Sequence, residues 1–189
     1  DNTDIEAKKL VSYVAKSPSA YELLTVEEHI EFIARAYNLI EYKEYAERLL
    51  INFNLSDKRN VLARDLSDGM QKKLNIICAL LPQPKVLLLD EPLNALDPSA
   101  VKELKNIFEI LKKTETAVLI STHMLDDFKE LWDKIYFMID GKIIASKVKD
   151  SKNKSLDLED LFLDVTQKYI DTYASSLVPV ENIVIEKDN

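Results

Sequence analysis

Two short, continuously apolar runs constrain the fold of this chain more than any other feature. Residues 86–89 (Val-Leu-Leu-Leu) and 117–120 (Ala-Val-Leu-Ile) are each followed by polar side chains. Such runs are typical of strands buried in a parallel sheet. Between them, Asp97 and Pro98 indicate a helix with an N-cap and a proline at its first position. The order strand, helix, strand predicts a parallel α/β core that binds ligands at the carboxyl ends of its strands.

The residues before the first apolar run predict a further strand and a small helical subdomain. Positions 10–14 form a short strand-like run. Thr25 and Glu28 have the spacing of a capping box, in which the threonine begins a helix and the glutamate closes its first turn. The apolar spacing continues this helix to about Leu39 and predicts a second helix over about 42–53. An α-helical subdomain is therefore expected at 21–65.

The remaining elements follow from turn and helix signals. One helix begins after Ser67 and is stopped by Pro82, and a short helix is expected over about 125–131. Asp140-Gly141 is typical of a type I′ hairpin, and the apolar spacing from Leu158 predicts a C-terminal helix. The chain thus divides into four predicted regions: 1–20, the end of a core segment; 21–65, helical; 66–146, a helix and the α/β core; and 147–189, a linker (147–155), helix and tail.

Composition excludes several classes of protein. The chain has 189 residues and a formal net charge of −8, so a basic stripe that binds DNA or RNA is not expected. Cys78 is the only cysteine, which excludes a disulfide framework and favours a reducing compartment. The longest unbroken apolar runs have about six residues, well below the roughly 18 that span a bilayer.

Glycine is unusually rare in this sequence. Only Gly69 and Gly141 are present, whereas an average usage of about 7% would give about 13. Glycine-rich phosphate loops need at least two closely spaced glycines, so the sequence contains none. The chain also begins at Asp1 rather than at a methionine, which makes a cut or processed N-terminus an expectation.

Polar side chains that could carry chemistry follow both apolar runs. A buried carboxylate needs a cation or a proton to balance its charge. Mg²⁺ on nucleotide phosphates would supply the cation, with Asp90 facing the metal and Glu91 polarising an attacking water as general base. A strand that ends in a polar turn explains the same pair, so both interpretations stay open. Parallel strands would bring His123 near Glu91.

The helix that begins at Ser67 offers a second candidate site. The serine hydroxyl, the first N–H groups and the helix dipole favour an anion, and Gly69 allows a ligand close to the backbone. An ordinary N-cap explains the serine as well. His29 is expected on the surface of a glutamate-rich helix, and Cys78 is expected in the core. Two charged pairs are interpreted as solvated faces: Lys72-Lys73 and Asp126-Asp127.

Together these motifs resemble those of the ATP-binding domain of an ABC transporter. The stretches that carry the resemblance are 24–30 (opening of the helical subdomain), 66–71 (signature motif), 86–92 (Walker B strand), 94–97 (D-loop), 121–123 (switch-histidine loop), 140–142 (late hairpin) and 158–163 (domain end in ABC-2 exporters). The resemblance covers about residues 5–166 in the family's order. It implies a P-loop NTPase-like parallel sheet, incomplete at its N-terminus, with the helical subdomain inserted.

The resemblance also implies a role for each candidate residue. In this family two domains face each other head to tail and bind ATP between them. Glu91 and His123 would be catalytic, acting on the water and on the γ-phosphate, and Asp90 would serve Mg²⁺ directly or through water. Four residues would bind nucleotide or link the two sites: Ser67, Gly69, Gln71 and Asp97. Ser67 and Gly69 would act in trans, on the ATP of the partner.

Three departures from the family pattern affect these expectations. The phosphate loop is missing, and without its N–H groups and lysine tight phosphate binding in cis is not expected. Lys16 stands at the Q-loop position, where the family has a metal-contacting glutamine, and an ammonium group repels Mg²⁺. Asp68 replaces a signature glycine and is expected to face solvent. This chain alone is therefore expected to hydrolyse ATP negligibly and to fold poorly.

The resulting prediction is the C-terminal portion of an ATP-hydrolysing ABC subunit that drives export. Its expected cofactors are ATP and Mg²⁺, and its expected partners are a second ABC ATPase domain and an integral membrane permease at the cytoplasmic face of the membrane, with no nucleic acid. The alternative is a naturally short, non-catalytic subunit that donates its signature motif to a partner ATPase. The retained Glu91 and His123 argue against this alternative, and Lys16 argues for it.

Overall fold

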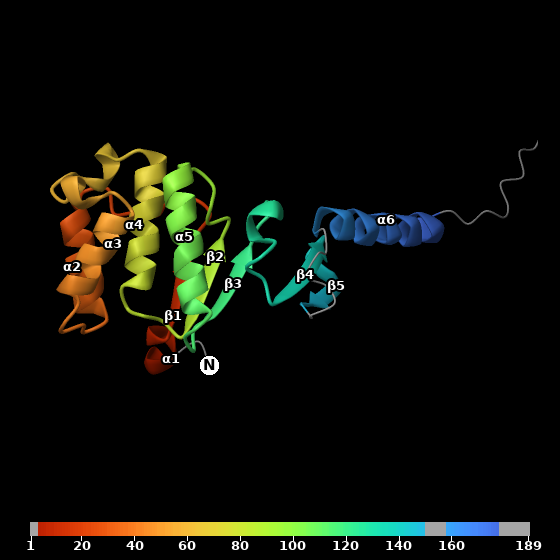
Figure 1. Cartoon of the computed structure of the whole chain (residues 1–189), viewed down its shortest axis with the longest axis horizontal. Coiled ribbons are helices and arrows are strands. Elements are labelled where there is room, and N and C mark those ends of the chain that lie inside the picture. The colour runs from red at the N-terminus through yellow and green to blue at the C-terminus, as the bar shows by residue number, and fades with distance from the viewer. Residues whose placement is uncertain (1–3, 150–157, 178–189) are drawn as a thin grey trace, which may run out of the picture. The chain divides into compact units, whose positions relative to one another are not determined.

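A three-stranded parallel sheet forms the core of the first part of the chain (Figure 1). The computed structural model describes residues 4–149 and 158–177. The strands are β1 (Val11–Val14), β2 (Val86–Asp90) and β3 (Ala117–Ser121), and they lie in that order. Residues 1–123 and 124–189 form two compact units, which are described separately. The predicted α/β class with a parallel, P-loop NTPase-like sheet is confirmed.

The sheet has one covered face and one open face. Successive side chains of a strand point to opposite faces, and the buried ones are Ser12, Val14, Leu87 and Leu89. Helix α4 (Asp68–Leu80) packs against β1 and helix α5 (Pro98–Leu111) packs against β3.

The prediction that 117–120 is a fully buried strand is wrong, because Leu119 is 60% exposed. Leu119 is paired with Leu88, which is paired with Tyr13, and Tyr13 is also exposed. These three side chains share one face of the sheet. Within the described residues, the covering helices lie against the other face.

Helices α2 (Val26–Ala36) and α3 (Lys43–Asn52) form the predicted helical segment together with two short 3₁₀ turns, η1 (Ser56–Lys58) and η2 (Ala63–Asp65). Both helices contact α4. Their shared core contains Val26, Ile30, Leu49, Leu50, Phe53, Leu74 and Ile77. Helix α4 therefore connects the helical segment to the sheet.

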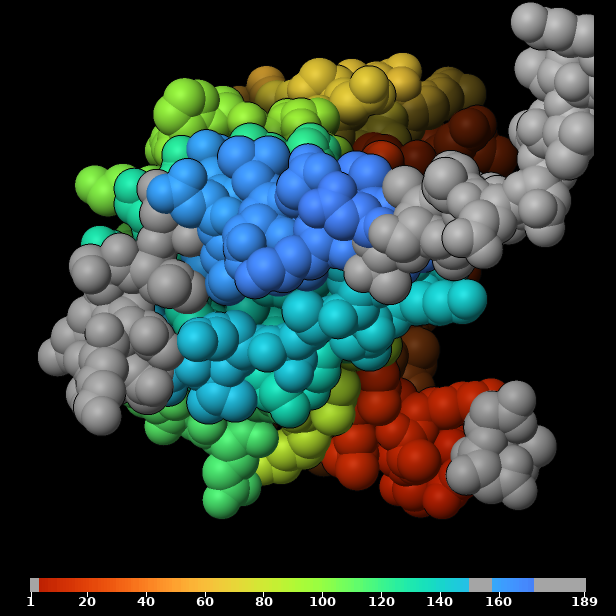
Figure 2. Space-filling view, turned by 90° about the vertical axis from the view of Figure 1, so that its right-hand side faces the viewer, coloured from red at the N-terminus to blue at the C-terminus, as the bar shows by residue number. Residues whose placement is uncertain are grey.

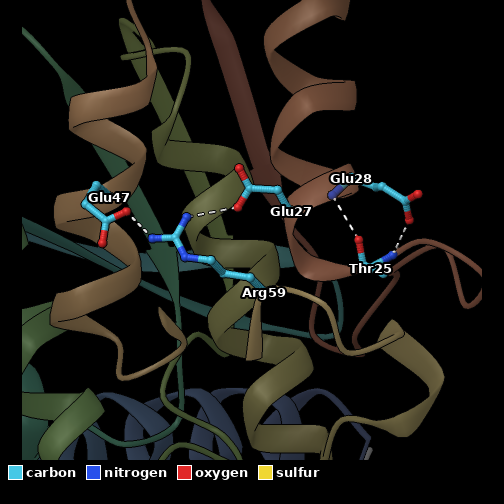
Figure 3. Close-up of polar contacts among 5 residues, drawn as sticks. All are labelled: Thr25, Glu27, Glu28, Glu47 and Arg59. Atoms are coloured by element: carbon cyan, nitrogen blue, oxygen red, sulfur yellow. Dashed lines mark hydrogen bonds and ion pairs between the residues drawn. The ribbon is translucent and has the colours of Figure 1, made fainter. Parts of the chain in front are cut away.

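The predicted capping box at the start of α2 is confirmed (Figure 3). The Glu28 N–H donates to Thr25 Oγ1 at 3.2 Å, and the Thr25 N–H donates to Glu28 Oε2 at 2.8 Å. These hydrogen bonds hold the pKa of Glu28 below its ordinary value. Beside the box, the Arg59 guanidinium donates to Glu47 on α3 and to Glu27 on α2, which raises the pKa of Arg59. This arginine ties the two helices to the loop after them.

The prediction that His29 lies on the surface is wrong. Only 4% of this residue is exposed. Its Nε2 accepts the Tyr21 N–H at 2.9 Å, so its Nδ1 carries the hydrogen and donates to the Thr25 carbonyl at 2.8 Å. A loop that folds back over α2 covers the histidine and uses both ring nitrogens.

The second unit contains η3 (Asp126–Phe128), the antiparallel strands β4 (Lys134–Ile139) and β5 (Lys142–Val148), and helix α6 (Leu158–Leu177). Asp140 and Gly141 have φ angles of 48° and 74°, as the predicted type I′ turn requires. Figure 2 shows α6 lying along the hairpin. The Phe137 and Phe162 rings lie 6.1 Å apart in this contact.

The structure differs from the sequence predictions in three further segments. The predicted helix over 125–131 is only the turn η3, because its Phe128 N–H and Leu131 N–H bond three residues back, as in a 3₁₀ helix. Helix α1 (Ile5–Lys9), capped by Asp4, was not predicted. Of the predicted linker, 147–148 belong to β5 and 150–155 lie outside the described residues, as do 178–189 of the tail.

Candidate functional site

The carboxyl ends of β2 and β3 bring two acids, a serine and a histidine together. Asp90 is paired with Ser121 in the sheet register, and the Ser121 hydroxyl donates to Asp90 Oδ1 at 2.6 Å. One residue further along β2, Glu91 Oε1 lies 2.7 Å from His123 Nδ1. A carboxylate oxygen only accepts, so Nδ1 carries the hydrogen in this contact. The predicted approach of His123 to Glu91 is therefore present.

Glu91 has a strained backbone and a carboxylate oxygen with no partner. Its φ angle is 46°, in the left-handed region, and its N–H donates to the Ser121 carbonyl at 2.9 Å. Such strain costs about 1–3 kcal/mol and is concentrated at functional sites. Its Oε2 is buried and has no hydrogen-bond partner among the described residues. The side chain is 14% exposed, against 71% for His123, so the glutamate is fixed beneath a more accessible histidine.

Lys72 lies at the same end of the sheet, and the interpretation of Lys72-Lys73 as a solvated face is wrong. Only 1% of Lys72 is exposed. Its Nζ donates to the backbone carbonyls of Ala15 at 2.8 Å, Lys16 at 3.1 Å and Asp90 at 3.3 Å. Burial lowers the pKa of Lys72, and the charges of Asp90 and Glu91 oppose that shift.

Lys16, predicted at the metal or phosphate position, follows β1 and is exposed. Its backbone carbonyl, rather than its ammonium group, makes the contact with Lys72. The side chain is therefore available to solvent at the edge that carries Asp90. Its role toward nucleotide stays a prediction.

Ser67 and Gln71 lie at the beginning of α4. Ser67 is the N-cap, and its Oγ accepts the Met70 N–H at 3.3 Å. The Gln71 side-chain amide donates to the Leu66 carbonyl at 3.2 Å. Ser67 is exposed, so its hydroxyl oxygen caps the helix and still faces solvent. Asp68, in the first turn, is exposed as predicted.

Gly69 packs directly against the loop between β2 and α5. A Cβ atom added at Gly69 would lie 2.5 Å from the Ala95 carbonyl oxygen, far inside contact distance. Ala95 itself has a φ angle of 65°, so this loop contains a second strained residue. The small size of Gly69 thus serves a contact within the chain, whereas the sequence had suggested close approach of a ligand.

Lys73 and Asp97 join the same two segments. Lys73 Nζ lies 2.6 Å from Asp97 Oδ2, and Asp97 Oδ1 accepts the Ala100 N–H at 3.0 Å as the N-cap of α5. The Lys73 ammonium is the main reason that the pKa of Asp97 is lowered. Two consecutive lysines of α4 therefore hold the strand ends and the 91–97 loop.

Comparisons with known proteins agree with this geometry. A family model described as "AAA domain, putative AbiEii toxin, Type IV TA system" matches residues 8–125. The chain is 33% identical over 148 residues to the uncharacterized ABC transporter ATP-binding protein YthP of Bacillus subtilis. A solved structure titled "Structure of ATP binding subunit of ABC transporter" superposes with a TM-score of 0.79 and 30% identity, over 84% of this chain and 69% of that one.

The chain belongs to the ABC transporter ATP-binding domain family. Other relatives are the B. subtilis ABC-type transporter ATP-binding protein EcsA, 32% identical over 83% of this chain, and the Streptococcus pyogenes lantibiotic transport ATP-binding protein SrtF, 32% identical over 80%. The matches span 62% of YthP, 66% of EcsA and 64% of SrtF. The predicted membership of this family is thereby confirmed.

The residues at the strand ends of this ABC domain fit a magnesium ion. Mg²⁺ takes one or two carboxylates and completes its shell with water and nucleotide phosphates. Asp90 offers such a carboxylate, and the Ser121 hydroxyl orients it. No group of three or more acidic, histidine or cysteine residues in the described ranges could hold a metal alone.

Two functional contacts of this ABC domain were missed at the level of sequence. The signal for buried lysines was present, because Ile76 and Ile77 lie one helical turn after Lys72 and Lys73 and are buried. Ser121 was quoted only as part of a motif, although its hydroxyl orients Asp90. Its partner follows from the strand register, which sequence alone did not specify.

Proposed function

We propose that this chain carries the water-activating and signature parts of an ATP-hydrolysing ABC transporter subunit. The observation that supports the proposal most is the Glu91–His123 contact of 2.7 Å at the edge where Ser121 orients Asp90. A general base must lie within hydrogen-bond reach of its water and must be held in one orientation. His123 occupies one oxygen of Glu91 and leaves the other, Oε2, to accept a hydrogen from water.

The roles of the neighbouring groups follow from this assignment. His123 donates through Nδ1 to Glu91. In the imidazolium form its Nε2 also carries a hydrogen and would donate it to a phosphate oxygen. When bound, Mg²⁺ would neutralise phosphate charge. Asp90 is the residue that would hold it, and the Ser121 hydroxyl keeps the Asp90 carboxylate in place. Lys16 supplies a cation at the same edge that suits a phosphate better than a metal.

The signature residues would act on the ATP of a second ABC domain. Ser67 is exposed at the N-terminus of α4, where a helix favours an anion. Gly69 and Asp97 fix this segment to the 91–97 loop. The sequence contains no glycine-rich phosphate loop. We therefore place the nucleotide cradle in a segment or chain other than these 189 residues.

The proposed partner beyond the second ATPase domain is an integral membrane permease, and the proposed transport direction is export. The family membership supports a transporter role, and residues 158–163 resemble the domain end of ABC-2 exporters. No helix in the described ranges is long and apolar enough to cross a bilayer. We propose that this domain sits at the cytoplasmic face of that permease.

A groove in the first unit is the surface we assign to the permease. It has a volume of about 360 Å³ and lies between β1, the loop after it, α2 and α4. The exposed aromatic residues Tyr21 and Phe32 line it, with ring centroids 5.2 Å apart. Exposed aromatic residues around a hollow are typical of a site that receives an apolar segment of a partner.

The assembly can be tested in the cell that makes this protein. The subunit would be purified from detergent-solubilised membranes through a tag, and both its ATP turnover and its co-purifying proteins would be measured. We expect one integral membrane protein to co-purify and ATP turnover to be retained, and Phe32→Asp to release the membrane protein. Matched Phe162→Asp, in the second unit, should not release it. A subunit found without any membrane protein and without turnover would refute the proposal.

A further inference from the structure

The most unusual buried group in the first unit is the ammonium of Lys72. A buried charge is costly unless hydrogen bonds replace its water. An ammonium has three N–H donors, and Lys72 has three carbonyl acceptors, those of Ala15, Lys16 and Asp90, at 2.8, 3.1 and 3.3 Å. The group is therefore fully satisfied although only 1% of the residue is exposed.

The three acceptors belong to two different strand ends. Ala15 and Lys16 directly follow β1, and Asp90 is the last residue of β2. These strands are paired along Val11–Val14 and Val86–Leu89, so their ladder ends immediately before the three carbonyls. Lys72 therefore joins the two segments just beyond the last pair of the ladder.

The same two segments carry the charged groups of the proposed nucleotide site. Asp90 and Glu91 follow β2, and Lys16 follows β1. Lys72 has no N–H group left to bind a ligand in this site, because backbone carbonyls accept all three. Its contribution is to the placement of other groups, because a carbonyl held at Asp90 also restricts the carboxylate of that residue.

We propose that Lys72 is a positioning residue: its ammonium group clamps the ends of β1 and β2 together and thereby sets where Lys16 and Asp90 meet the nucleotide. This assignment rests on the proposed function for its effect on turnover. The clamp itself does not depend on nucleotide chemistry. Lys72 is on α4, the helix that Ser67 caps. The clamp therefore also ties the signature helix to the strand ends of its own domain.

The clamp can be tested first by NMR on the 189-residue chain, once circular dichroism shows that the purified chain is folded. A buried ammonium with three hydrogen bonds exchanges its hydrogens slowly with water, so its ¹H–¹⁵N signal becomes visible, whereas exposed lysines give none. Lys72 and Lys73 are both buried, so we expect two such signals. Lys72→Met should remove one of them and shift the carbonyl ¹³C resonances of Ala15, Lys16 and Asp90.

Two further variants separate the clamp from a general effect on folding. Lys85→Met removes an exposed lysine that pairs with Glu115 at 3.2 Å, and it should leave both signals in place. Lys72→Gln keeps two N–H donors without the charge and should shift the three carbonyl resonances less than Lys72→Met. If the wild-type chain shows no slowly exchanging ammonium signal that Lys72→Met removes, the proposal is wrong.

The effect on function is measured in the native assembly purified from membranes. A displacement of about 1 Å at a reacting group costs up to about 10²-fold in rate. We expect Lys72→Met to lower kcat by roughly 10- to 100-fold, with KM for ATP within about twofold of wild type. Lys72→Gln should lie between these values, and Lys85→Met should match wild type.

The outcomes distinguish this proposal from the proposed function. If Glu91→Gln abolishes turnover but Lys72→Met retains the wild-type kcat, the positioning role is overturned and the proposed function stands. If Glu91→Gln retains full turnover, the proposed function fails, and the positioning role fails with it. If both Lys72 variants lose folded protein, or lose kcat in proportion to their loss of thermal stability, Lys72 is a structural residue only.

Discussion

The Lys73 ammonium lies 2.6 Å from the Asp97 carboxylate and joins helix α4 to the first residue before helix α5. Lys73 is buried, whereas Asp97 is about half exposed, so the pair sits at the rim of the domain. Gly69 packs on Ala95 beside it. The beginning of α4 and the 91–97 loop are therefore joined by an ion pair and by a close packing contact.

Lys73→Met should raise the pKa of Asp97 toward its ordinary value, because the ammonium is the largest cause of its lowering. A carboxyl group whose pKa is lower in the folded chain than in the unfolded chain stabilises the folded state at pH values above its unfolded-state pKa. This stability is lost as the pH falls through the folded-state pKa. The wild type should therefore lose it below about pH 4. Solvent screening at the half-exposed Asp97 keeps the effect small. A carbonyl-detected NMR titration of Asp97 measures it, with Lys85→Met as control, and an unchanged titration in Lys73→Met would contradict the pairing.

Gly69→Ala should destabilise the first unit by about 1–3 kcal/mol. The added methyl group would lie 2.5 Å from a backbone carbonyl, which cannot rotate away as a side chain can. Alanine's better helix propensity favours the variant by about 1 kcal/mol, so the clash must outweigh it. Urea unfolding followed by far-UV circular dichroism is the measurement, because the single tryptophan, Trp132, lies in the other unit. Asp68→Ala is the control, and equal midpoints for Gly69→Ala and wild type would disprove the contact.

Cys78 is partly exposed, because it lines the groove beside α4, but its thiol should react slowly with thiol reagents in the folded chain. Burial raises the pKa of its thiol to about 12. The reactive species is the thiolate, so only about one molecule in 10⁴ is reactive at pH 8. A disulfide reagent such as DTNB should report no fast thiol in native buffer and one equivalent in urea. Prompt reaction of the native chain at pH 8 would show that the thiol is accessible.

His29→Leu should cost about 1–3 kcal/mol, because it removes a buried ring that accepts the Tyr21 N–H and donates to the Thr25 carbonyl. His123→Leu is a matched control, since the chain has only two histidines and His123 is 71% exposed. The control should cost less stability than His29→Leu, because the lost ring is exposed and, among the described residues, has one hydrogen-bond contact, with Glu91 Oε1. Thermal unfolding of both variants compares them, and a larger loss for His123→Leu would reverse the assignment of the two histidines.

Local rules predicted the elements that local contacts determine. The Thr25 capping box, the Asp140-Gly141 turn and the strand over 86–89 depend on residues within a few positions of one another, and all three are present. Over 125–131 a 3₁₀ turn takes the place of the predicted helix, because the Phe128 and Leu131 N–H groups bond three residues back rather than four.

The errors concern polar residues whose partners are distant in sequence. Lys72 can be buried because the Ala15 and Lys16 carbonyls accept its hydrogens, and these residues lie more than 50 positions earlier in the sequence. His29 is buried because the loop at Tyr21 folds back over it. A charged or polar side chain is buried only where hydrogen-bond partners are present. These partners lie on segments that are distant in the sequence, and the spacing of neighbouring residues does not predict how such segments are aligned.

The candidate site was predicted from motif order rather than from any one residue. Asp90, Glu91 and His123 were expected at one sheet edge, and they lie there because β2 and β3 are parallel neighbours. Ser121, which orients Asp90, and the two lysines of α4 that hold the surrounding segments required the structure.

The measurement that tests the account most directly is ATP turnover by the native assembly carrying Glu91→Gln. The amide keeps the size of the side chain but loses the basicity that a water-activating group needs. We predict a loss in kcat of at least about 10²-fold with ATP binding retained. Glu115→Gln, at an exposed glutamate, should match wild type. A Glu91→Gln assembly that turns over ATP at the wild-type rate would contradict the catalytic role of Glu91 and favour a subunit that only donates its signature motif.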